Sequence, residues 1–68
     1  MNNERYKEAV NLLMKWWQYR SESMEAGDYC RIVGYTERYT AGVEMLSLLT
    51  GKSHGEINRD VTVATPGI

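Results

Sequence analysis

The chain has 68 residues and a mass of 7.8 kDa, which is enough for one small domain. This length excludes two-lobed kinases, barrels and dinucleotide-dependent dehydrogenases. Its composition, 43% hydrophobic and 25% charged, is typical of a chain that folds. The formal net charge of −1 argues against a broad electrostatic hold on nucleic acid or on an anionic membrane.

Cysteine and histidine are too sparse for a disulfide framework or a zinc site, because Cys30 and His54 occur once each and lie far apart. We therefore expect no metal and no cofactor. The charged N-terminus precedes no apolar signal-peptide core. The longest apolar run, Leu12-Leu13-Met14, is far shorter than the roughly 20 residues of a membrane span. A cytoplasmic protein that does not contact a membrane is the expectation.

Residues 4–26 are predicted to form an amphipathic helix. Apolar side chains recur at helical spacing, at Tyr6, Val10, Leu13, Trp17 and Met24. Asn2 or Asn3 can cap the start of this helix, and Gly27 can take the left-handed conformation that ends it.

A second helix is predicted over 28–50, with Asp28 as its N-cap and Gly51 as its end. Two helices joined by so short a connection form an antiparallel hairpin, so the fold class is all-α. The predicted core places residues of the first helix against residues of the second, namely Tyr6, Val10, Leu13 and Trp17 against Ile32, Tyr39, Val43 and Leu46.

Residues 52–68 lack the long helical pattern of the first two segments. The chain is therefore predicted to consist of a helical hairpin (1–51) and an extended C-terminal tail (52–68). Ser53 and Glu56 fit a capping box that would start a single helical turn. Residues 61–63 alternate like a short strand, and Pro66-Gly67 predicts a turn or a loose end.

The apolar surface exceeds what one hairpin can bury. Trp16 and Trp17 point about 100° apart, so one partner helix cannot easily cover both, and Trp17 is assigned to the core. The second helix has another apolar seam, bordered by arginines on one side and glutamates on the other. We expect a homo-oligomer, most simply a two-fold four-helix bundle. The expected interface is Trp16, Cys30, Gly34, Arg38, Ala41, Met45 and Leu48.

On the second helix, Gly34 and Gly42 are both candidates for close contacts with another helix, because glycine costs a helix about 1 kcal/mol relative to alanine and is tolerable where another backbone passes close by. An antiparallel pair of second helices, crossing near Arg38 and Ala41, is the expected arrangement. The two copies of Cys30 would then lie far apart.

Catalytic motifs are not supported by their context. Gly51-Lys52-Ser53 resembles the end of a phosphate-binding loop, but the required glycine is missing and Leu46 stands in its place. Ser53, His54 and Glu56 are neighbours in sequence, whereas catalytic triads come from distant segments. The prediction is a protein that is not an enzyme.

The leading functional hypothesis is a small helical interaction and oligomerisation module that binds itself and another protein. Compact proteins without catalytic residues often serve as accessory or inhibitory factors in bacteria and phages, and the hypothesis includes such a role for this chain. The alternative is an oligomer that binds a nucleotide or nucleic acid. Arg31, Tyr35 and Arg38 would form its anion contact, because they lie within two turns on one side of a helix.

Overall fold

Two long helices form the hairpin that the sequence predicts, as the computed structural model of residues 1–65 shows. Helix α1 spans Asn3–Ala26 and helix α2 spans Tyr29–Thr50. Local chemistry sets their ends. The backbone N–H of Arg5 donates to the side chain of Asn2 at 2.8 Å, and that of Arg31 donates to Asp28 at 3.3 Å. Gly27 and Gly51 close the two helices in the left-handed conformation, with φ of 70° and 75°.

A third helix, α3, spans His54–Ala64, where the sequence predicted a single turn followed by an extended tail with a strand at 61–63. That prediction was wrong beyond its first turn. The N-cap was identified, since the N–H of Glu56 donates to Ser53 Oγ at 3.2 Å. The helix continues because Ile57 and Val61, one turn apart, are buried against the hairpin. The Pro66-Gly67 turn lies outside the described residues.

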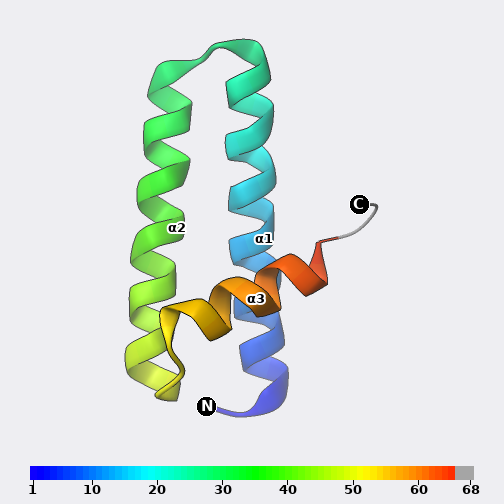
Figure 1. Ribbon diagram of the computed structural model, residues 1–68, viewed down its shortest axis with the longest axis vertical. Helices are drawn as coiled ribbons and strands as arrows, with labels where there is room; N and C mark the ends of the chain where they lie inside the picture. Colours follow the sequence, from blue (N-terminus) through cyan, green and yellow to red (C-terminus); the bar gives the residue numbers. More distant parts are fainter. Residues whose placement is uncertain (66–68) are drawn as a thin grey trace.

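Helix α3 crosses the hairpin near the end opposite the α1–α2 turn (Figure 1). Its 11 residues are about 16 Å long, enough to span two packed helices. We call the side of the hairpin that α3 covers the front and the opposite side the back. Beyond α3, towards the turn, no further helix among residues 1–65 covers the front.

The core takes two residues from each helix: Val10, Leu13, Val43, Leu46, Ile57 and Val61. Four of these were predicted from the hairpin pattern. The predicted core residues Tyr6 and Tyr39 are only partly buried at its edge, and Ile32 is half-buried. A core of three helices rather than two accounts for the difference, because α3 supplies the remaining apolar contacts.

Trp16, rather than the predicted Trp17, is the tryptophan that packs against the core. Its ring lies over Gly42, where an added Cβ would be 3.2 Å from Trp16 Cζ3. Trp17 is instead 42% exposed and lies on the front of the hairpin. Helix α2 meets α1 on the Leu13 and Trp16 side, which leaves the next residue in sequence facing the front.

Candidate functional site

The second apolar seam of α2 faces away from the rest of the protein. Met45 is 57% exposed and Leu48 is 82% exposed, and both Cys30 and Ala41 are exposed. These residues recur at three-, four- and seven-residue spacing and therefore form one stripe along the helix. We call this stripe, with Gly34, the α2 seam. An apolar stripe in this position is typical of a surface that another molecule covers.

Gly34 lies within the α2 seam and has open space beside it. A Cβ added at Gly34 would meet no atom within 4 Å, whereas one added at Gly42 would lie 2.6 Å from Leu13 Cδ2. The predicted close helix contact is therefore confirmed at Gly42 and is not made within the chain at Gly34. Glycine at position 34 makes the helix less stable than alanine would, and no close contact within residues 1–65 offsets this loss.

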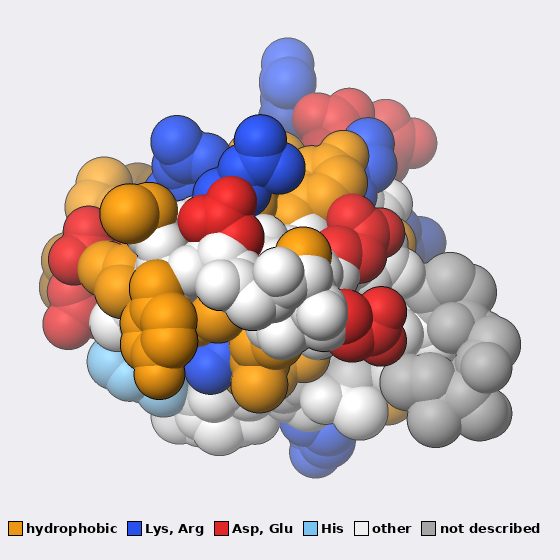
Figure 2. Space-filling view, turned by 90° about the horizontal axis from the view of Figure 1, so that it is seen from above, with side chains coloured by type: hydrophobic (Ala, Val, Ile, Leu, Met, Phe, Trp, Pro, Cys, Tyr) orange, Lys and Arg blue, Asp and Glu red, His pale blue; other side chains and the backbone are white. Residues whose placement is uncertain are grey.

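Charged residues of opposite sign border the α2 seam. At about 100° per residue, Glu37 and Glu44 lie on one side of it, and Arg31 and Arg38 lie on the other. Arg31 pairs with Asp28 at 3.3 Å. The ion pairs formed among residues 1–65 do not include Arg38 or the two glutamates. Figure 2, seen from the turn end, shows several Lys and Arg side chains along the upper edge of the view and others at its lower edge, with acidic side chains among them.

The predicted anion contact is brought together at the edge of the same surface. Arg31, Tyr35 and Arg38 line a cavity of about 250 Å³ with Cys30 and Gly34. The Arg38 guanidinium lies 5.3 Å from the centre of the Tyr35 ring, and Tyr35 packs on Tyr19 at 5.5 Å. The arrangement presents two guanidinium groups beside an aromatic surface.

A larger cleft on the front of the hairpin was not predicted. It has a volume of about 680 Å³ and lies where α3 leaves the hairpin uncovered. The rings of Trp17 and Tyr39, 5.0 Å apart, lie at this cleft. The sequence signal that could have located it is the spacing of Ile57, Val61 and Ala64, which is helical and predicts the third helix that forms one wall.

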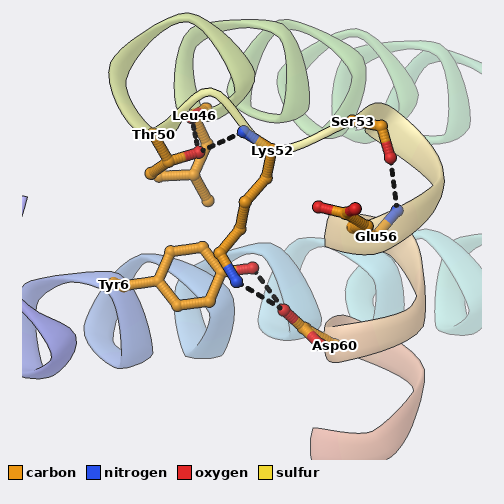
Figure 3. Close-up of polar contacts among 7 residues, drawn as sticks. All are labelled: Tyr6, Leu46, Thr50, Lys52, Ser53, Glu56 and Asp60. Carbon is orange, nitrogen blue, oxygen red and sulfur yellow. Dashed lines mark hydrogen bonds and ion pairs between the residues drawn. The ribbon is translucent and has the colours of Figure 1, made fainter.

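A polar cluster joins the three helices at the open end of the hairpin (Figure 3). The Tyr6 hydroxyl donates to Asp60 Oδ2 at 2.5 Å, and Lys52 Nζ lies 3.8 Å from the same oxygen. Burial, reinforced by the hydrogen bond to Asp60, raises the pKa of Tyr6 to about 12. A tyrosine with so high a pKa stays protonated near neutral pH, which favours a structural donor over a catalytic base.

The other residues with catalytic or metal-binding chemistry do not converge. His54 is exposed at the start of α3, and Ser53 is occupied as its N-cap. Lys52 Nζ lies 4.6 Å from the centre of the Tyr6 ring, so Lys52 packs on an aromatic ring rather than in a phosphate-binding loop. Among residues 1–65, no cluster of His, Cys, Asp or Glu could hold a metal ion. The helices of this part of the chain are too short or too polar to cross a membrane.

Comparison with protein-family models, with curated proteins and with solved structures finds no match for this chain.

Proposed function

We propose that this chain is a non-enzymatic helical interaction module, and that the α2 seam binds a second copy of the chain. The supporting observation is the exposed seam itself, in which Met45 and Leu48 leave large apolar side chains in water. A second helix packed at Gly34 would also compensate for the glycine, because the missing side chain lets two backbones approach closely.

The charges beside the seam favour parallel α2 helices over the antiparallel pair expected above. In an antiparallel two-fold pair, the arginine sides of the two seams meet each other, and so do the glutamate sides. In a parallel pair, the arginine side of one copy meets the glutamate side of the other. Arg38 of each copy then approaches Glu37 of its partner, a contact worth up to about 1 kcal/mol.

A seam variant tests the assembly. Leu48→Glu would bury a charge in the interface without disturbing the fold, because Leu48 is 82% exposed in the single chain. Val63→Glu is the matched control, since Val63 is 79% exposed on α3 and lies off the seam. Sedimentation equilibrium should show a dimer for the wild type and for Val63→Glu, with Leu48→Glu dimerising at least about tenfold more weakly.

Oxidation of Cys30 tests the direction of the helices. A parallel two-fold pair places the two Cys30 residues at the same height in the seam, so mild oxidation should give a covalent dimer in non-reducing electrophoresis. Dimers that resist this cross-link would exclude the parallel arrangement. A wild type that is monomeric at high micromolar concentration would exclude the assembly altogether.

A second candidate function is the binding of a nucleotide or oligonucleotide at Arg31, Tyr35 and Arg38. The observation in its favour is that these three residues line one cavity. An NMR titration with ATP tests it on the Leu48→Glu background, where the seam is open. Arg38→Gln should weaken ATP binding by about tenfold, and raising the salt concentration should weaken it further. ATP that shifts no resonance near Tyr35 would exclude this function.

A further inference from the structure

The cleft on the front of the hairpin lies away from the α2 seam and has the character of a ligand site. Its volume of about 680 Å³ falls within the range of small-molecule pockets, about 300–1,000 Å³. Trp17, Tyr39 and Val61 give it an apolar surface, and polar side chains of α1 and α3 form its two walls. A pocket with an aromatic surface and a few polar groups can orient a ligand that is partly flat and partly polar.

The hydroxyl groups that line the cleft already donate hydrogen bonds within the protein. Ser21 donates to the carbonyl of Trp17 at 3.1 Å, and Thr62 and Thr65 donate to carbonyls of α3, each at 2.9 Å. The Tyr39 hydroxyl donates to Asn58 Oδ1 at 2.8 Å. A hydroxyl that has given up its single proton offers only lone pairs to a ligand. These four hydroxyl groups therefore only accept hydrogen bonds from a ligand, whereas the side-chain amides of Gln18 and Asn58, which also line the cleft, can donate them.

The charge of the cleft favours a cationic ligand. Among residues 1–65, Glu22 is the one charged residue that lines it, and a carboxylate only accepts hydrogen bonds. Arg20 is a cation near the cleft, with its guanidinium 4.9 Å from the centre of the Trp17 ring. Its Nε donates to Thr36 on α2 at 2.6 Å, and Arg20 does not line the cleft. Arg20 therefore makes a cation–π contact with Trp17 from outside the cleft lining.

We propose that this cleft binds an organic cation in which a flat apolar group carries an ammonium or guanidinium group. The flat group lies against Trp17 and Tyr39, and the cation lies beside Glu22. Two sources share this chemistry: a free aromatic amine, and an arginine next to an aromatic residue in a peptide.

Three small probes of similar shape test the charge preference. They are 2-phenylethylamine, which is a cation, 2-phenylethanol, which is neutral, and 3-phenylpropanoate, which is an anion. NMR of the full chain follows the indole N–H of Trp17 and the side-chain amide of Asn58. The indole of Trp16, which lies over Gly42, is an internal control. The amine should bind at least about tenfold more tightly than the anion and shift the Trp17 resonance but not that of Trp16.

A matched pair of variants tests the role of Glu22. Glu22→Gln keeps the shape of the side chain and removes its charge, so amine binding should weaken by at least about fivefold. Glu25→Gln removes an exposed charge on the same helix that does not line the cleft, and amine binding should not change. Equal binding of the three probes, or equal effects of the two variants, would overturn the proposal.

The peptide N-acetyl-Phe-Arg-amide distinguishes the two sources. Binding at least about tenfold tighter than that of the amine would support a protein partner, and comparable binding would support a small molecule. Failure of both the amine and the peptide to bind would overturn the proposal. The assembly through the α2 seam would be unaffected, because Leu48 and the other seam residues do not line this cleft.

Discussion

At Gly42, α2 lies directly against side chains of α1. An added Cβ would lie 2.6 Å from Leu13 Cδ2 and 3.2 Å from Trp16 Cζ3. Gly42→Ala should lower the free energy of unfolding, because overpacking costs about 1–3 kcal/mol while helix propensity returns at most about 1 kcal/mol. Urea denaturation measures the change.

Gly34→Ala is the matched control on the same helix, with no atom within 4 Å of the new methyl group. In the dissociated chain it should raise the free energy of unfolding by up to about 1 kcal/mol. If Gly42→Ala stabilised the chain as much as Gly34→Ala, the close contact with Leu13 would be wrong.

Tyr6 makes stability depend on pH in the alkaline range. Its pKa rises from 10.0 to about 12 in the folded chain, mainly through burial and then through the hydrogen bond to Asp60. The folded state therefore holds the phenol proton more tightly than the unfolded state does. This contribution to stability is complete below about pH 10 and is lost as the pH rises through about 12.

Tyr6→Phe should remove this part of the alkaline loss of stability, measured by urea denaturation between about pH 9 and pH 11.5. Part of the loss should remain, because burial also raises the pKa of Tyr39. Tyr29→Phe is the control, since Tyr29 is an exposed residue at the start of α2. Identical pH profiles for the wild type and Tyr6→Phe would contradict the assignment.

At the scale of elements, α3 is held to the hairpin by a few buried contacts. Ile57 has no exposed surface, and Val61 packs one turn further along. Ile57→Ala should cost about 2–5 kcal/mol, as buried truncations do, and should unfold a chain of this size in part or fully at modest urea concentrations.

Val63→Ala, on the exposed side of the same helix, should change the stability by less than about 0.5 kcal/mol. Circular dichroism with urea denaturation compares the two variants. A small effect of Ile57→Ala would mean that α3 does not pack on the hairpin in solution.

At the scale of the whole molecule, the core is small and the exposed apolar area is large. Among residues 1–65, six buried apolar residues form the core, whereas large apolar side chains remain exposed on all three helices. If the α2 seam binds a second copy, dimerisation adds stability by mass action. The Tm of the wild type should then rise with protein concentration.

The Tm of Leu48→Glu should depend less on concentration, and the Tm of Val63→Glu should behave like that of the wild type. Differential scanning calorimetry over a hundredfold dilution series makes the comparison. A Tm of the wild type that is independent of concentration would argue against assembly in this range.

The sequence by itself determined the helix ends and the hairpin, because these depend on neighbouring residues. The side chains of Asn2 and Asp28 cap their helices by accepting a hydrogen bond from the backbone N–H three residues later. Gly27 and Gly51 end helices through their backbone conformation. The apolar period located Val10, Leu13, Val43 and Leu46 correctly. It also located the exposed α2 seam.

Only the tertiary structure decided which secondary structure residues 54–64 adopt. Their local signals are mixed, since the β-branched Val61, Thr62 and Val63 favour a strand while Ser53 caps a helix. Burial of Ile57 and Val61 against the hairpin favours the helix, and no local rule contains that contact. The cleft at Trp17 follows from the same packing, because one of its walls is α3 and the exposure of Trp17 depends on how much of the hairpin α3 covers.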